Sequence, residues 1–237
     1  MMKKLLFILI FSTLLVATPP NFEGYDGSAV VVDLNSSYQE SFGSFTHERL
    51  NPCSTFKILN SLIALEINVI QDENEIIPWD GKIREYAVWN KDHSMRSAIS
   101  VSTVWFYQEL AHRVGQKRMQ ELVSKVGYGN NDTSKTLIDF WLGKGSLKIS
   151  LNEQVLFLSK LIRDELPFSK RSMEIVKDIV KLDNTFSGKT GTCGGIGWFV
   201  GFVQVPQNTK VFAFALKGKG ASGAEAKRIA MEYLKAQ

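Results

Sequence analysis

The chain is organised around Pro52-Cys53-Ser54-Thr55-Phe56-Lys57-Ile58-Leu59-Asn60-Ser61-Leu62-Ile63-Ala64-Leu65-Glu66, which reads as a helix with almost no solvated face. Apolar side chains surround its axis, a pattern typical of a helix buried at the centre of a domain. Two polar groups interrupt this surface, the hydroxyl of Ser54 and the amine of Lys57. They lie three residues apart and therefore on one face, one turn apart. An internal lysine beside a serine is costly to bury unless it has a function.

A serine hydroxyl becomes a good nucleophile when a base takes its proton, and Lys57 could be that base for Ser54 if its amine is neutral near pH 7. Desolvation in an apolar pocket lowers a lysine pKa by up to about 3–5 units. The positive end of the first helical turn would favour a developing oxyanion. The alternative is an incidental serine and a lysine whose amine reaches solvent, because S-x-x-K alone arises by chance in many chains.

The chain begins with a short basic opening, Met1-Met2-Lys3-Lys4, and continues with an uncharged apolar run from Leu5 to Ala17. This layout is typical of a secretory signal and is too short for a comfortable membrane span. We expect residues 1–19 to be removed on export to the periplasm or the extracellular space. An uncleaved anchor is the alternative, because the cleavage site is not a clean A-x-A. No later segment suits stable membrane insertion.

The 237 residues carry 28 basic and 24 acidic side chains, a formal net charge of +4 that becomes +2 without the two lysines of the signal. This bias is too weak to argue for a nucleic-acid partner. The remaining residues, 20–237, suit a single catalytic domain of globular composition. The three histidines are isolated and no cysteine cluster is present, so a metal site is not expected.

The hydrophobic period changes twice along the chain, from strand to helix and back to strand. Strands are expected over residues 27–34, 41–46, 188–192, 197–205 and 210–216. Helices are expected over residues 97–114, 118–126, 151–163, 171–182 and 224–234.

These elements predict an α/β fold of the α+β type. Hairpin-length connections make the central sheet antiparallel. The sheet and its flanking helices would form a discontinuous subdomain from about residues 20–50 and 183–237. Residues from about 51 to 182 would form a mostly helical subdomain. A cleft between two such units is where a site is expected.

Four further motifs follow the serine in order. They are Ser102-Thr103-Val104, Tyr128-Gly129-Asn130, Trp141-Leu142 and Lys189-Thr190-Gly191. In enzymes that combine S-x-x-K with K-T-G, the K-T-G strand lines the site opposite the serine. Its lysine offers a cation to an anionic substrate, and its glycine allows close backbone approach. Each motif is weak alone, but their order, spacing and setting together are specific.

With these motifs the chain resembles the class D β-lactamases, or oxacillinases, of the serine β-lactamase and penicillin-binding superfamily. The resemblance runs from about Gly27 to the C-terminus. Accessory stretches match as well: Trp79-Asp80-Gly81, Trp89-Asn90-Lys91-Asp92, Ser146-Leu147-Lys148-Ile149-Ser150 and Gly197-Trp198-Phe199-Val200-Gly201. The resemblance implies a transpeptidase-like fold and hydrolysis of the β-lactam ring of penicillin-type antibiotics, which confers resistance.

For the catalytic residues, the resemblance implies acylation of Ser54 and hydrolysis of the acyl-enzyme. The family's central lysine, here Lys57, is carboxylated by CO2 to N6-carboxylysine, and this carbamate is the general base for both steps. No other cofactor is implied. Only a neutral amine adds CO2, which agrees with the buried position argued above. Ser102 would relay a proton to the leaving nitrogen, and Trp141 would donate its indole N–H to the carbamate.

For substrate binding, the resemblance implies that Lys189 and Thr190 hold the substrate carboxylate beside Gly191. Backbone N–H groups of Ser54 and Thr192 would form the oxyanion hole. Two apolar residues would form walls of the lysine pocket, and plain core packing is the alternative for them and for the tryptophan. These two residues are Val104 and Leu142.

The last helix departs from the family pattern. Many members carry there an arginine that grips the substrate carboxylate, three residues before an apolar position. Counting back from Ile229 leads to Ala226, so we assign no arginine anchor. Lys227 and Arg228 are adjacent, but we expect them to point elsewhere on the helix.

Two other functions share these motifs. A β-lactam sensor domain would be acylated once without turnover, and penicillin-sensing receptors resemble class D enzymes closely. A penicillin-binding D,D-peptidase is disfavoured by the combination of Y-G-N, Trp141 and S-x-V.

The two cysteines form a further candidate pair. Cys53 precedes the serine and Cys193 lies two residues after the K-T-G glycine, so the two positions are expected to be close. Some class A carbapenemases have a disulfide at the same offsets, and exported proteins keep disulfides. Two free buried thiols are the alternative.

Overall fold

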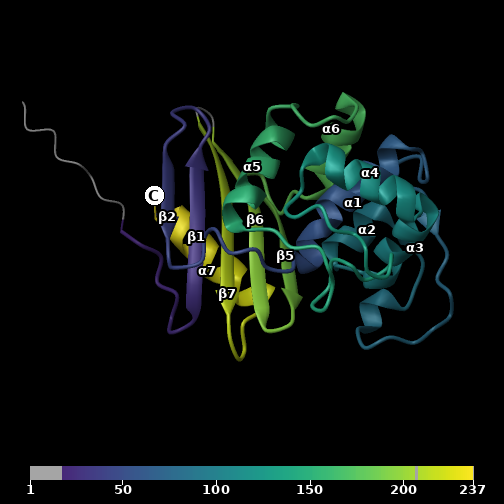
Figure 1. Cartoon of the computed structure of the whole chain (residues 1–237), viewed down its shortest axis with the longest axis horizontal. Helices are drawn as coiled ribbons and strands as arrows, with labels where there is room; N and C mark the ends of the chain where they lie inside the picture. The colour runs from purple at the N-terminus through teal and green to yellow at the C-terminus, as the bar shows by residue number, and fades with distance from the viewer. Residues whose placement is uncertain (1–17, 206–207, 237) are drawn as a thin grey trace, which may run out of the picture.

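A five-stranded antiparallel sheet forms one half of the protein, and a cluster of helices lies beside its β5 edge (Figure 1). The computed structural model describes residues 18–205 and 208–236, so nearly all of the expected signal peptide lies outside the described residues. The sheet has the order β2-β1-β7-β6-β5, and both ends of the chain contribute to it. The predicted antiparallel sheet is therefore confirmed. Its strands are β1 (Asp26–Asp33), β2 (Gln39–Phe42), β5 (Phe186–Cys193), β6 (Ile196–Val205) and β7 (Asn208–Lys217).

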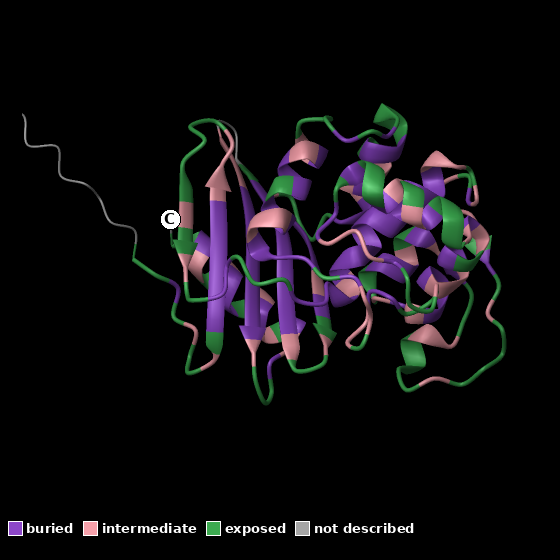
Figure 2. Cartoon of the chain, in the orientation of Figure 1, coloured by how far each residue is buried: buried purple, intermediate pink, exposed green. Residues whose placement is uncertain are grey.

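The predicted buried helix is the centre of the helical half. Its first turn is a 3-10 helix, η1 (Cys53–Phe56), and α1 (Lys57–Glu66) continues from it. Every residue of α1 except Glu66 is buried, and Figure 2 shows how few exposed positions this region has. The other helices are η2 (Ala87–Trp89), α2 (Met95–Ser100), α3 (Val104–Val114), α4 (Gln116–Val126), α5 (Leu151–Ile162), α6 (Lys170–Ile179) and α7 (Gly223–Lys235). A small second sheet pairs β3 (Ile76–Ile77) with β4 (His93–Ser94).

The sheet buries both of its faces, each against a different helix. Alternate residues of a strand point to opposite faces, so Val31 packs with α7 while Val30 belongs to the larger core that includes α5. Helix α5 falls in the range assigned from sequence to the helical subdomain. In the structure it packs on the sheet instead, against β7, β1 and β6. The reason is its apolar face, where Val155 and Leu158 are buried in the core that also holds Val30.

The prediction of a single helix over residues 97–114 is wrong. Helix α2 ends at Ser100, and α3 starts at Val104. Between them Ser102 has a φ of 59°, a left-handed conformation that an α-helix cannot contain. Val101 is exposed at this break. The break turns the Ser102 side chain toward the lysine of α1.

Two other elements end three or more residues before their predicted bounds. Strand β2 covers residues 39–42 rather than 41–46, in register with β1. Helix α6 stops at Ile179 rather than at residue 182. Val180 leaves the helix because its carbonyl accepts a hydrogen bond from the Gly188 N–H, and Lys181 then bridges to Ser187.

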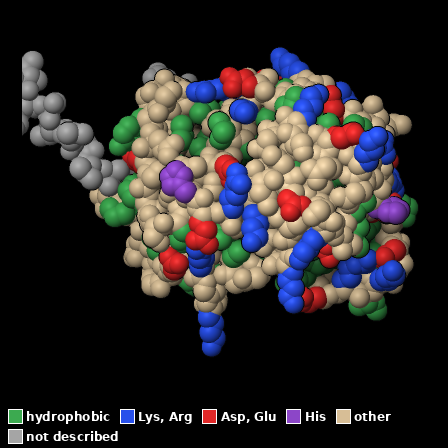
Figure 3. All heavy atoms as spheres, viewed as in Figure 1, with side chains coloured by type: hydrophobic (Ala, Val, Ile, Leu, Met, Phe, Trp, Pro, Cys, Tyr) green, Lys and Arg blue, Asp and Glu red, His purple; other side chains and the backbone are tan. Residues whose placement is uncertain are grey.

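Charged side chains are dispersed on the surface. On the face drawn in Figure 3, Lys and Arg are interspersed with Asp and Glu rather than gathered in one basic stripe. This agrees with the small net charge of the whole sequence. Among the described residues, no helix has the length and apolar character needed to cross a bilayer.

Candidate active site

The serine and lysine of the central helix contact each other directly. Lys57 Nζ lies 2.6 Å from Ser54 Oγ and 3.3 Å from Ser102 Oγ. Ser54 is held in the 3-10 turn, and the preceding Cys53 has a φ of 52°. A non-glycine residue in this region is strained unless its surroundings hold it there. Ser54 thus follows a residue with a left-handed backbone conformation, and Ser102 has such a conformation itself.

Lys57 is completely buried, with none of its surface exposed to solvent. Burial, and after it the positive charge of Lys189, hold the pKa of the Lys57 amine well below its ordinary value of 10.5. The Tyr107 ring of α3 lies 5.5 Å from Lys57 Nζ. No carboxylate contacts Lys57 among the described residues. The amine is therefore neutral much more readily than that of an exposed lysine.

Trp141 is fully buried beside this centre. Its ring stacks on Phe56 with centroids 5.4 Å apart, and Phe140 packs edge-on against both rings. Its backbone carbonyl accepts a hydrogen bond of 3.0 Å from the Cys53 N–H. Its indole Nε1 is buried and finds no acceptor within the described part of the chain. A buried donor without a partner costs free energy, so this position calls for an acceptor.

Strand β5 lines the site with the K-T-G residues. Lys189 is buried, and its Nζ donates to the Thr190 carbonyl at 3.1 Å. Burial and the charge of Lys227 lower the pKa of Lys189 to about 8. At Gly191 an added Cβ would lie 3.0 Å from the Pro52 carbonyl oxygen and 3.2 Å from the Ser54 nitrogen. Glycine therefore allows β5 to lie directly against the turn that carries the serine.

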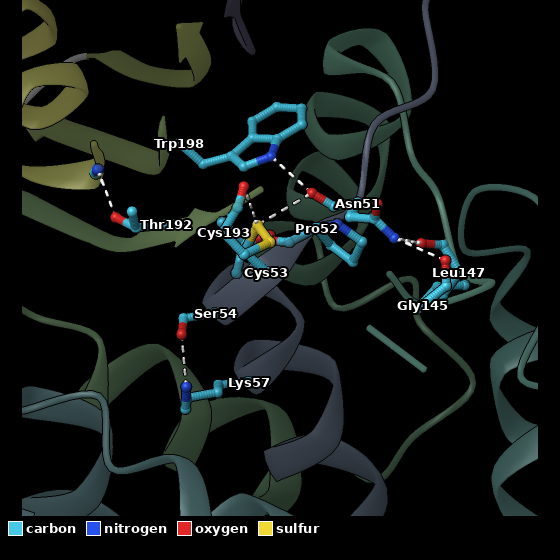
Figure 4. Close-up of a disulfide and its surroundings, with 12 residues drawn as sticks. Asn51, Pro52, Cys53, Ser54, Lys57, Gly145, Leu147, Thr192, Cys193 and Trp198 are labelled. Carbon is cyan, nitrogen blue, oxygen red and sulfur yellow. Dashed lines mark hydrogen bonds between the residues drawn. A yellow bond between two sulfur atoms is a disulfide. The ribbon is translucent and has the colours of Figure 1, made fainter. Parts of the chain in front are cut away.

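Cys53 and Cys193 are joined by a disulfide, with their Cα atoms 5.7 Å apart. Figure 4 shows this bond between the serine turn and the end of β5. Nearby, Trp198 Nε1 donates to the Asn51 carbonyl at 2.9 Å. Thr192 Oγ1 accepts a hydrogen bond of 2.8 Å from the Gly223 N–H at the start of α7. These contacts hold the turn that carries Ser54 against the end of β5.

The remaining predicted residues lie at the border of the site. Val104 starts α3 two residues after Ser102, and Leu142 follows Trp141. Both are half-buried, and their part in walling the lysine pocket stays a prediction. Within the described residues, no group of His, Cys, Asp or Glu side chains could hold a metal ion.

Two residues near the site were not found from the sequence. Tyr107 was missed, although its position three residues after Val104 on the same helix could have indicated it. Lys227 was expected to point away, but it lines one cavity with Lys189 and Thr190. Arg228 does point away, since it pairs with acidic residues on the surface.

Comparison with known proteins covers almost the whole described chain. The family model of the penicillin binding protein transpeptidase domain matches residues 27–235. The probable β-lactamase YbxI of Bacillus subtilis (strain 168) is 39% identical over 222 residues, which are 90% of this chain and 82% of that protein.

Two solved structures have nearly the same fold. A class D β-lactamase from Bacillus subtilis superposes with a TM-score of 0.87 at 38% identity, covering 91% of this chain and 92% of that one. The C-terminal domain of the Bacillus licheniformis BlaR penicillin-receptor superposes with a TM-score of 0.85 at 35% identity and the same coverage. With its serine, lysine and K-T-G strand assembled around one centre, the chain belongs to the class D β-lactamases of the penicillin binding protein transpeptidase superfamily.

Proposed function

We propose that this protein hydrolyses the β-lactam ring of penicillin-type antibiotics through an acyl-enzyme on Ser54, and so confers resistance to them. The observation that carries the proposal is the 2.6 Å contact between Ser54 Oγ and the buried amine of Lys57. A buried amine that is neutral can take the serine proton, which an exposed ammonium cannot. Membership of the family supplies the class of substrate.

The base would be a carbamate on Lys57, and the surrounding residues fit it. A depressed pKa favours the neutral amine, the form that adds CO2. The unpartnered Nε1 of Trp141 would donate to a carbamate oxygen. The nearby charge of Lys189 would favour a negative group there. When present, the carbamate supplies an oxygen base at the end of the lysine side chain.

Acylation would use three side chains in sequence. Ser54 Oγ attacks the lactam carbonyl carbon as its proton passes to the base at Lys57. Ser102, with Oγ 3.3 Å from Lys57 Nζ, then delivers its proton to the ring nitrogen as the C–N bond breaks and takes the proton held by the base, which leaves the base free again. A water molecule, deprotonated by the same base, attacks the Ser54 ester. The ring-opened acid leaves, and Ser54 recovers its proton.

The oxyanion would be held by the backbone N–H groups of Ser54 and Thr192. Gly191 lets the strand lie against the serine turn, and the disulfide ties the two together. The substrate carboxylate would bind Lys189 and Thr190, whose side chains line one cavity. These assignments give the site a reacting end, at Ser54 and Lys57, and an anchoring end, at Lys189 and Thr190.

Export would suit this chemistry. We propose that residues 1–19 are a cleaved signal, and the disulfide supports export because such bonds persist in oxidising compartments. The mass of the protein recovered outside the cytoplasm should correspond to a chain that starts near residue 20. Recovery of the full-length chain in the membrane fraction would favour an uncleaved anchor.

A β-lactam sensor is the second candidate, because the BlaR receptor domain has nearly the same fold. A sensor is acylated once and stays acylated, whereas an enzyme turns over. Nitrocefin hydrolysis, followed with excess substrate, separates the two. We expect many turnovers per protein, a loss of rate in CO2-depleted buffer at acid pH, and recovery with bicarbonate. Ser54→Ala should abolish acylation, and Lys57→Ala should impair deacylation more than binding. One equivalent of product and a stable adduct would instead assign the sensor function.

A further inference from the structure

A second lysine lines a cavity beside Lys189 and Thr190 of the K-T-G strand. A cavity of about 300 Å³ lies where β5 meets α7 and the ends of α2 and α6. Its polar lining includes Ser100, Thr190 and three lysines, Lys181, Lys189 and Lys227, but no Asp or Glu. A concave site with positive charge and no acidic residue suits an anion.

The three lysines differ in how their charges are compensated. Lys181 pairs with Asp178 at 2.8 Å. Among the described residues, the hydrogen bonds of Lys189 Nζ go to the carbonyl and hydroxyl oxygens of Thr190. Lys227 is half-buried, and its Nζ has no hydrogen bond or ion pair within residues 18–205 and 208–236. Two of the three positive charges at the cavity therefore lack an acidic contact.

Lys189 and Lys227 repel each other. The charge of Lys227 contributes, after burial, to the lowered pKa of Lys189. Asp183 also senses the charge of Lys227, but its carboxylate is exposed and accepts the backbone N–H groups of Thr185 and Phe186 at 2.8 and 2.7 Å. Within the described part of the chain, its interaction with Lys227 is electrostatic at a distance rather than an ion pair. Bringing one negative group into the cavity would relieve this repulsion.

The geometry of α7 explains why Lys227 is available. Ala226 is completely buried against the sheet, so a side chain at that position faces the core. The next residue is turned by about 100° around the helix, and there it reaches the cavity at the edge of β5. Arg228, one further step round, is held by Glu23 and Glu225.

We infer that Lys227 is a specificity-determining residue that shares the carboxylate of the β-lactam with Lys189 and Thr190. This inference rests on the proposed function for its substrate. The carboxylate would enter between two cations, and Thr190 Oγ1 would orient it. Charge-assisted hydrogen bonds of this kind are stronger than neutral ones. The site should therefore distinguish a β-lactam carboxylate from its neutral ester.

The test measures binding without requiring reaction. In the Ser54→Ala protein, the Kd for benzylpenicillin and for its methyl ester is measured by NMR titration. Adding Lys227→Ala should weaken benzylpenicillin binding about tenfold and leave the ester unchanged. Lys227→Arg should keep most of the preference. Lys219→Ala removes an equal charge from the exposed loop before α7 and should change neither Kd.

The pH dependence gives a readout that a merely structural role would not move. Benzylpenicillin binding should weaken as pH rises past about 8, where Lys189 loses its proton. Without the repulsion from Lys227, the pKa of Lys189 rises, so this weakening should move to higher pH in Lys227→Ala. The other titratable groups near the pair, Lys57, Lys181 and Asp183, are present in both proteins.

In the reactive protein, Lys227→Ala should raise KM for benzylpenicillin and keep kcat. Equal weakening of acid and ester, or no weakening, would overturn the role of Lys227. Absence of acylation on Ser54 would overturn the proposed function instead, and the Kd comparison would still decide the role of Lys227.

Discussion

The ammonium group of Lys189 acts across the site on Lys57, and its charge adds to burial in lowering the pKa of the Lys57 amine. Under the proposed function, these two lysines, which are far apart in the sequence, would have different tasks. Lys189 faces the anchoring end and keeps its charge up to a pH of about 8. Lys57 is the group that this charge helps to keep neutral. In the proposed mechanism, the lower pKa of Lys57 would allow one site to hold both a base and a cation.

The buried amine of Lys57 should lower the free energy of unfolding of the protein. Because its folded-state pKa is depressed, the unfolded chain binds a proton that the folded chain does not, and stability rises with pH up to about 10.5. Lys57→Met, which keeps the volume, should stabilise the fold at pH 7 by about 1–4 kcal/mol. It should also flatten the pH dependence between pH 7 and 10.

Thermal unfolding in CO2-depleted buffer measures this effect, and ~1 kcal/mol corresponds to about 2–4 °C in Tm for a chain of this size. The control is Lys117→Met on the exposed side of α4, which should leave both Tm and its pH slope nearly unchanged. A Lys57→Met protein with an undiminished slope would show that Lys57 does not carry the pH dependence.

The unpartnered indole of Trp141 predicts a change in CO2 affinity. Trp141→Phe removes the N–H but keeps an aromatic ring against Phe56. The bicarbonate concentration for half-maximal turnover should rise about tenfold, since a charge-assisted hydrogen bond is lost. A burst followed by a slow phase should appear at low bicarbonate.

Trp198→Phe is the matched control for this experiment. Trp198 is equally buried, but its N–H is satisfied by the Asn51 carbonyl. Its loss should lower Tm without moving the bicarbonate requirement. The same dependence of turnover on bicarbonate in Trp141→Phe and the wild type would mean that Trp141 only packs in the core.

The disulfide should raise the free energy of unfolding by several kcal/mol. It closes a loop with a sequence separation of 140 residues, for which chain entropy gives about 4–5 kcal/mol. Thiol titration of the unfolded, unreduced protein should find no free thiol. Cys53→Ser, Cys193→Ser and the double substitution should each lower the free energy of unfolding by similar amounts, and reductant should change only the wild type. Two titratable thiols in the wild-type protein would refute the bond.

Gly191→Ala tests the close approach of β5 to the serine turn. Its Cβ would meet backbone atoms of Pro52 and Ser54 at 3.0 and 3.2 Å. Forcing these apart should cost about 1–3 kcal/mol of stability and slow acylation on the order of 100-fold. Pre-steady-state acylation kinetics report the second effect. A normal acylation rate would mean that the strand can shift without disturbing the oxyanion donors.

Much of the fold was predictable because its signals are local. The apolar run after Ser54 leaves a helix no solvated face, and strands such as β6 and β7 are rich in β-branched or aromatic residues. The motif residues Ser54, Lys57 and Lys189 could be linked because the family pattern places them in one site. The structure adds the contact of 2.6 Å between the first two.

The remaining features depend on tertiary contacts that a local pattern does not contain. The residues around Ser102 have helical periodicity, yet the chain breaks there so that Ser102 can contact Lys57. The direction of Lys227 depends on which side of α7 the sheet covers, and counting from Ile229 did not give this. The packing of α5 mainly on the sheet likewise follows from long-range contacts.

The bond between Cys53 and Cys193 gives the protein a second covalent path between the serine and the β5 strand. The loop around Ile83, a residue 87% exposed, is a natural place for a protease to cut. A cut there would leave two fragments still fastened to each other within a few ångströms of Ser54. Such nicked protein would run as one band without reductant and as two with it. The peptide chain can thus be cut far from Ser54 while the serine turn and β5 stay covalently joined.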